Sequence, residues 1–164
     1  MSNNNIQMNI SGRQKFTING DESKFIMLNP GDMGIVARLG DAIPVLNGFA
    51  EQYDALMRTS LGDDETEKST EESMIEFNKK FTEIDNQLRD TINNLFNYDV
   101  CSVCADGGSM LDLQDGEYRF SVIIEALMPI YEETISAEME KLVKKMNKRV
   151  EKYTTQDHKK RQRK

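Results

Sequence analysis

The chain has 164 residues and a mass of 18.8 kDa, which is the size of one domain with a short arm or tail. Hydrophobic residues make up 38% of it and charged residues 30%, and ten Met but no Trp are present. No apolar run reaches the roughly 20 residues that a membrane-spanning helix needs, and residues 1–12 lack the pattern of an export leader. With a net charge of −7, this composition argues against a membrane protein, a disulfide-rich secreted scaffold and a general nucleic-acid binder.

The charge is divided unevenly along the chain. Residues 1–58 carry 5 basic and 6 acidic side chains, residues 59–138 carry 5 and 19, and residues 139–164 carry 11 and 3. A middle region of net charge −14 is therefore followed by an end of net charge +8. This polarity predicts either contact between the two regions, within a chain or between subunits, or separate solvated faces. The candidate electrostatic residues are Asp63, Asp64, Glu65, Lys144, Lys145 and Lys148.

Three regions are expected along the chain: a flexible N-terminus over residues 1–13, one domain over residues 14–155, and a basic disordered tail over residues 156–164. The domain begins with a predicted β-hairpin. Its first strand contains Phe16 and Ile18, which alternate with polar residues, and its turn is Asn19-Gly20, the strongest short-range hairpin signal. Residues 24–28 are predicted to form the returning strand. A lone hairpin is marginal in water, so it is expected to pack on a helix or pair with another chain.

An apolar stripe with helical spacing follows Asp32, a candidate helix cap, and runs to Arg58. Pro44 lies inside this stripe. Because proline lacks an amide donor and clashes with the preceding turn, it predicts a kink or a break, with Asp41 as a candidate cap for a restarted helix.

A second helix is predicted after residues 59–73, which read as a mobile acidic loop with Ser69 or Thr70 at the start of the helix. Its apolar residues step by three and four in a pattern close to a heptad repeat. The residues of this stripe are Met74, Phe77, Phe81, Ile84, Leu88, Ile92 and Leu95.

Residues 97–116 are rich in Gly and Asp and are predicted as a turn region, with one short helical turn considered at Ser109–Leu113. A last helix is predicted from Glu117 to Tyr153, with a kink near Pro129. The expected fold is therefore α+β and mainly α. It has an N-terminal β-hairpin and about three principal helices, the last one long with a basic tail.

The residues offer little for catalysis or metal binding. Cys101-Ser-Val-Cys104 has the spacing of half a zinc site or a redox pair, but zinc needs four ligands and the only histidine is His158 in the tail. Two reduced, half-buried cysteines are the alternative that we favour. The carboxylates of residues 106–117 do not follow the alternation of a calcium loop, and no phosphate-binding glycine loop is present. We expect a protein without cofactor, metal or enzymatic activity.

The order of these elements resembles a group of small phage and prophage proteins from Gram-positive hosts that lie among tail genes and are described as tail-assembly-chaperone-like. The resemblance covers about residues 15–153. It is carried by the hairpin motif Phe16-Thr-Ile-Asn-Gly20, the entry Asn29-Pro-Gly-Asp32, Ile84-Asp85, Ile92-Asn-Asn-Leu95-Phe96, the pattern from Phe120 to Tyr131, and Lys152-Tyr153.

The resemblance implies a non-enzymatic role in tail assembly, in which the protein binds the helical tape-measure protein and recruits tail-tube subunits. It implies protein partners, with a homo-oligomer as an option and neither membrane nor nucleic acid, in the host cytoplasm or the virion. Met side chains and a free hairpin edge suit such binding. The candidate partner-binding residues are Phe16, Ile18, Phe25, Met74, Phe77, Phe81, Tyr131, Met139 and Met146.

Two other functions stay open. The acidic middle region suits a small phage-encoded inhibitor or regulator, whose clustered carboxylates imitate phosphates at a basic site on a host protein. A structural component of the virion is the third option.

Overall fold

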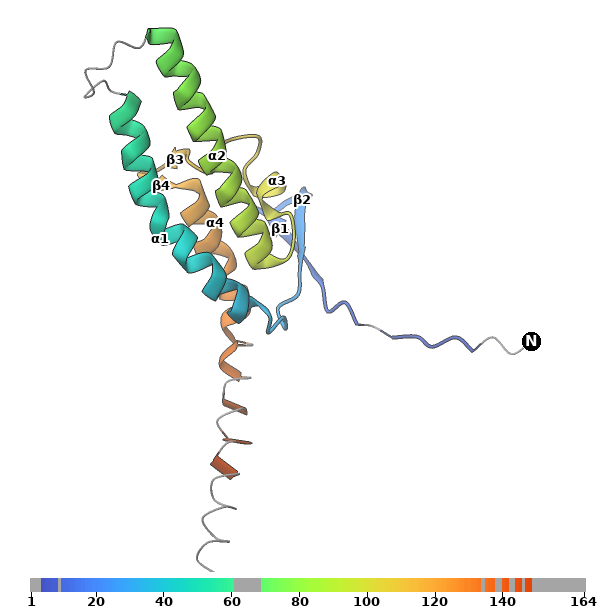
Figure 1. Cartoon of the computed structure of the whole chain (residues 1–164). Helices are drawn as coiled ribbons and strands as arrows, with labels where there is room; N and C mark the ends of the chain where they lie inside the picture. The colour runs from blue at the N-terminus through green and yellow to red at the C-terminus, as the bar shows by residue number, and fades with distance from the viewer. Residues whose placement is uncertain are drawn as a thin grey trace, which may run out of the picture.

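The structure, a computed structural model, describes residues 4–8, 10–60, 69–133, 135–137, 140–141, 144–145 and 147–148. It confirms the expected class, because the protein is α+β and mainly helical, with an N-terminal β-hairpin followed by helices (Figure 1). The predicted loop over residues 59–73 falls largely outside the described residues, and the predicted tail over residues 156–164 falls wholly outside them.

The hairpin consists of β1 (Gln14–Ile18) and β2 (Asp21–Leu28), which pair antiparallel. Asn19 and Gly20 connect the strands with φ angles of 52° and 76°. These two positive values match the right-handed twist of the flanking strands, which is why Asn-Gly is favoured in such turns. The predicted hairpin and its turn are therefore confirmed.

The first helix is α1 (Ile35–Ser60), which runs through Pro44 without interruption. The break considered at Pro44 and the restart at Asp41 are therefore wrong. Proline removes one donor from the helix, but Ala42 before it and Phe49 after it are both buried, so packing supports both sides of the proline and the helix continues. Asp32 lies just before the helix, where its Oδ1 accepts a hydrogen bond from the amide of Gly34 at 2.9 Å.

The second helix is α2 (Thr70–Phe96), and it begins where the sequence predicted. Ser69 Oγ accepts the amide of Glu72 at 3.2 Å, and Glu72 Oε2 accepts the amide of Ser69 at 3.2 Å, which is a complete capping box. The helix ends at Asn97, which has a φ of 50°. The members of the predicted stripe that are buried are Ile84, Leu88, Ile92 and Leu95.

The predicted turn region contains a short helix and two short strands that were not predicted from the sequence. A short helix, α3 (Val100–Cys104), follows α2, and β3 (Leu113–Gln114) pairs with β4 (Glu117–Tyr118). The short helical turn considered at Ser109–Leu113 is a single hydrogen-bonded turn, in which Asp112 N donates to Ser109 O at 3.3 Å, and Leu113 already belongs to β3. The Asp115-Gly116 turn between β3 and β4 has φ angles of 51° and 85°.

The next helix, α4 (Arg119–Leu127), ends two residues before Pro129. The Met128 amide still donates to Ile124 O at 2.9 Å, but Pro129 has no amide to continue the pattern. Residues 129–133 and 135–137 are helical again. Where the sequence predicted a kink near Pro129, the structure therefore has a break in the helix at Met128.

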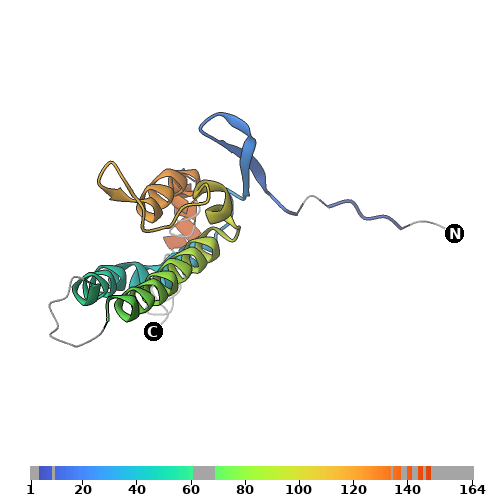
Figure 2. The same ribbon diagram turned by 90° about the horizontal axis from the view of Figure 1, so that it is seen from above.

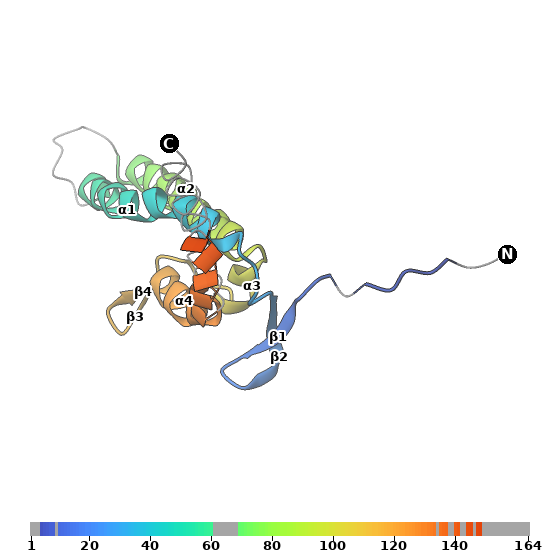
Figure 3. The same ribbon diagram turned by 90° about the horizontal axis from the view of Figure 1, so that it is seen from below.

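The helices form two layers with the hairpin at one side. Figures 2 and 3 show α1 and α2 side by side in one layer, and α4 with β3 and β4 in the other. The hairpin lies next to α3. The core between these elements includes Ile26 and Leu28 of β2, Leu88 and Ile92 of α2, and Leu127 of α4.

Candidate functional site

The α1–α2 pair extends beyond the second layer. In Figure 1, both helices continue past α4, β3 and β4 towards Ser60 and Thr70. Tyr53 is the last ring of α1 that the second layer covers, because its centroid lies 5.6 Å from that of Tyr118 in β4. Beyond this contact the heptad stripe of α2 has no third helix against it in the described part of the chain. We call this end of the two helices the tip.

Apolar side chains gather on the tip. Met74 is 67% exposed and Ile75 is 64% exposed, although both lie in a long helix. Phe77 and Phe81 are half-buried and stack with ring centroids 5.8 Å apart. A hollow of about 490 Å³ lies beside them, and its lining includes Thr70, Ser73, Met74, Phe77 and Asn78. The tip therefore brings together three predicted partner-binding residues: Met74, Phe77 and Phe81.

A second apolar site lies between the hairpin and α4, and we call it the hairpin groove. Phe16 and Ile18 of β1 form one wall, and Val122 and Ala126 of α4 belong to the other. The groove has a volume of about 430 Å³, and Cys104 of α3 also lines it. Two predicted partner-binding residues therefore lie in this groove, separate from those of the tip.

The remaining predicted residues are distributed elsewhere. Phe25 is on the outer face of β2, 40% exposed, with Lys15 Nζ 4.8 Å from its ring centroid. Lys144, Lys145 and Lys148 are exposed and helical. Five of the predicted residues lie outside the described residues: Asp63, Asp64, Glu65, Met139 and Met146.

Tyr131 corrects one of the predictions, because it belongs to the core. Its side chain is 1% exposed, and its ring lies 6.0 Å from that of Phe96. The helix that resumes after Pro129 turns this face inwards against the end of α2. Tyr131 is therefore not available to a partner on the surface.

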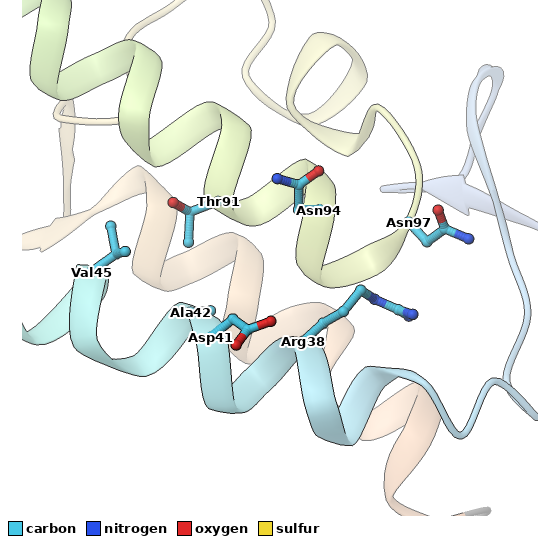
Figure 4. Close-up of a pocket in the computed structure, with 7 residues that line it drawn as sticks. All are labelled: Arg38, Asp41, Ala42, Val45, Thr91, Asn94 and Asn97. Carbon is cyan, nitrogen blue, oxygen red and sulfur yellow. The ribbon is translucent and has the colours of Figure 1, made fainter.

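A polar cleft lies between the first half of α1 and the end of α2 (Figure 4). Arg38 points along it towards Asn97, but its guanidinium is already bound to the Asp32 carboxylate and to Leu95 O. Asp41 and Thr91 complete the polar lining. The cleft thus offers hydrogen-bonding groups for a partner, and its arginine serves to hold α1 against α2.

A network of ionic hydrogen bonds fixes the loop between α3 and β3, and the sequence reading missed it. Asp85 of α2 accepts hydrogen bonds from Ser109 Oγ at 2.8 Å, Met110 N at 2.6 Å and Arg89 Nε at 2.9 Å. Burial alone would raise the pKa of Asp85, but these hydrogen bonds outweigh it and hold the pKa below its usual value. Arg119 adds a bond to Ala105 O at 3.0 Å.

The two cysteines lie on α3 as free thiols, Cys101 buried and Cys104 half-buried. Burial raises the pKa of Cys101 to about 12 and also raises the pKa of Cys104. Since the thiolate is the reactive form, both side chains are poor nucleophiles at neutral pH. Within the described residues, no three His, Cys, Asp or Glu side chains are grouped so as to hold a metal ion.

No protein-family model, curated protein or solved structure matches the chain. Among the helices that the structure describes, none is long and apolar enough to cross a membrane. The class of protein that the fold defines is a mainly helical α+β protein, and the features that it offers to other molecules are the tip, the hairpin groove and the polar cleft.

Proposed function

We propose that this chain is a non-enzymatic phage protein that acts like a tail assembly chaperone. Its clients are other tail proteins, and the first of them is the helical tape-measure protein. The proposal joins the resemblance of residues 15–153 to tail-region proteins with one structural observation, the uncovered apolar stripe of the tip. Before the virion is assembled, the place of action is the cytoplasm of the host.

The tip suits a helical client because it is itself an incomplete helical layer. Met74 and Phe77 are one turn apart on α2, and Phe81 lies one turn further, so they form a continuous row. An amphipathic client helix laid along this row would complete the third helix that the tip lacks. Methionine adapts to different neighbours, which suits a long client with varied sequence.

The acidic-inhibitor alternative receives less support from the arrangement of charges on α2. Mimicry of a phosphate backbone requires carboxylates in a continuous row. Among the described residues, Lys79 and Lys80 interrupt the acidic residues of the exposed face, and Lys80 Nζ lies 3.1 Å from Glu76 Oε1. Local pairing of this kind reduces the negative field that a basic partner would meet.

The proposal is tested by co-expression with the tape-measure and tail-tube proteins of the same phage, followed by affinity purification through a tag on this chain. We expect the tape-measure protein to co-purify. The variant Met74→Glu should weaken that binding at least about tenfold, because a charge would be buried in an apolar contact. Recovery of neither tail protein would refute the proposal.

A matched control separates loss of binding from loss of folding. Val36 is an apolar residue of α1 that is 47% exposed and lies at the other end of the helix from the tip. The variant Val36→Glu adds the same charge at a comparable exposure, and it should bind the tape-measure protein as well as the unchanged chain does. Equal losses in both variants would mean that the tip is not the client site.

A further inference from the structure

The segment that precedes β1 has the sequence pattern of a strand, but no strand in the described part of the chain pairs with it. Ile6, Met8 and Ile10 alternate with polar residues, which is the period-two pattern of a β-strand with one apolar face. Their side chains are 74%, 68% and 86% exposed. Residues 4–8 and 10–13, which we call the arm, run away from the body of the molecule in all three views (Figures 1 to 3).

The base of the arm is fixed to the body, and this sets its direction. Arg13 donates hydrogen bonds to Met27 O at 2.9 Å and to Asn97 O at 3.2 Å. Next to it, Gly12 has a φ of 56°, and a Cβ at this position would lie only 2.8 Å from Asn29 Oδ1. The chain therefore leaves the body at a defined point.

Folding back onto the same hairpin would disrupt this base. For the arm to pair with its own β1, the chain would have to reverse over residues 11–13. Arg13 would then lose its contacts with the carbonyl groups of β2 and of the α2 end, and Gly12 would lose its close approach to Asn29. The fixed exit favours a partner strand in another molecule.

We propose that the arm of one copy adds as a third strand to the β1 edge of a second copy and places Ile6, Met8 and Ile10 against its hairpin groove. The partner is thus a second copy of this chain. The arm residues 6–10 equal β1 in length, since β1 has 5 residues. Apolar residues at every second position of the arm match the spacing of Phe16 and Ile18 in the groove wall.

In the second copy, the free edge of β1 can take a third strand. Among the described residues this sheet has the strands β1 and β2 only, and β2 is the strand that faces α3. Within the same part of the chain, no strand pairs with the outer edge of β1 next to the groove. A two-stranded hairpin is marginal in water, and a third strand with an apolar face is the usual remedy. Strand addition supplies main-chain hydrogen bonds, while the groove takes the apolar side chains.

The test is the oligomeric state of the full chain, measured by sedimentation equilibrium over a series of protein concentrations. We expect the average molar mass to rise with protein concentration above the 18.8 kDa of a single chain. The triple variant Ile6→Asn, Met8→Asn and Ile10→Asn removes the apolar face of the arm. The Kd for self-association should therefore rise by about a hundredfold or more. The control variant Asn5→Gln with Gln7→Asn changes the polar face of the same arm, and it should associate as the unchanged chain does.

A second measurement reports on the groove itself through Cys104, which lines it. Alkylation of Cys104, carried out at alkaline pH because burial raises the pKa of its thiol, should slow as the concentration of the unchanged chain rises, and it should not depend on concentration in the triple variant. A monomeric unchanged chain, or self-association that survives the triple variant, would overturn the inference. The inference would also be overturned if the unchanged chain were monomeric and the triple variant lost only its binding to a tail protein. The Met74→Glu variant should keep its self-association, so this inference stands or falls independently of the proposed function.

Discussion

At the scale of single residues, Asp85 shows how one side chain connects distant parts of the chain. It lies on α2 and binds the backbone and side chain of residues 109 and 110, at the start of a loop that precedes β3. Arg89, one turn later, reaches the neighbouring carbonyl of Gly108. These contacts act together with the buried side chains of Met110 and Leu111 to fix the loop that leads into β3.

The variant Asp85→Asn should lower the free energy of unfolding by about 1–3 kcal/mol at pH 7, because it removes the acceptor charge from a half-buried network. The lowered pKa means that the stabilisation by ionised Asp85 is full above its ordinary pKa near 4 and is lost as the pH falls through the lowered value. Urea unfolding at pH 7 and at about pH 3 checks this, and the gap between variant and parent should shrink at the lower pH.

Asp90 on the same helix provides the control, since its side chain is exposed. The variant Asp90→Asn should leave the unfolding midpoint nearly unchanged at both pH values. A gap for Asp85→Asn that stays constant with pH would show that the charge of Asp85 does not contribute.

Individual residues were predicted best where spacing alone decides their environment. The stripe from Ile84 to Leu95 is buried as its heptad spacing predicted. Spacing does not reveal which neighbour covers an apolar face, and Tyr131 and Met74 show the two outcomes. Tyr131 meets Phe96 and is buried, whereas Met74 lies beyond the end of the second layer and is exposed.

At the scale of elements, the strongest local signals gave the strongest predictions. The Asn19-Gly20 hairpin and the Ser69 start of α2 both depend on a few adjacent residues with clear backbone preferences. Asp115-Gly116 carries the same kind of turn signal and marks β3–β4, so this small hairpin was readable from the sequence. α3 was not, because its five residues depend on packing against α2 and against β2, and β2 is far away in the chain.

The capping box of α2 gives a prediction about the first turn of the tip. The variant Ser69→Ala removes the acceptor for the Glu72 amide and should lower the stability of that turn by about 1 kcal/mol. Amide hydrogen exchange at Glu72 should therefore become about fivefold faster, by the usual relation between free energy and equilibrium. Thr70→Ala, one residue later, keeps the cap and serves as the control. Unchanged exchange in Ser69→Ala would mean that the box adds nothing in solution.

At the scale of the whole molecule, the uneven charge and the proposed addition of the arm to a second copy would hold copies together by different forces. Residues 59–138 carry a net charge of −14 and residues 139–164 carry +8, so copies associating through these regions would be held by Coulomb attraction. The arm before Arg13 has no charged residue. Contacts made through it are apolar and main-chain in character.

Salt therefore distinguishes the two modes of association. Screening shortens the reach of charges from about 10 Å at 0.1 M ionic strength to about 3 Å at 1 M. If the arm carries the contact, the Kd for self-association should change by less than about threefold across this range. Sedimentation at both salt concentrations checks this, and weakening by tenfold or more would identify the opposed charges as the main contact.

The separation of the tip from the hairpin groove has a consequence for valency. The two lie on different parts of the molecule, so arm exchange leaves the tip open. A joined pair would present two tips to one long client, and the second tip would bind at the high effective concentration set by the first. Weak individual contacts would then hold an elongated client firmly, yet each would release in turn as a growing structure displaced it.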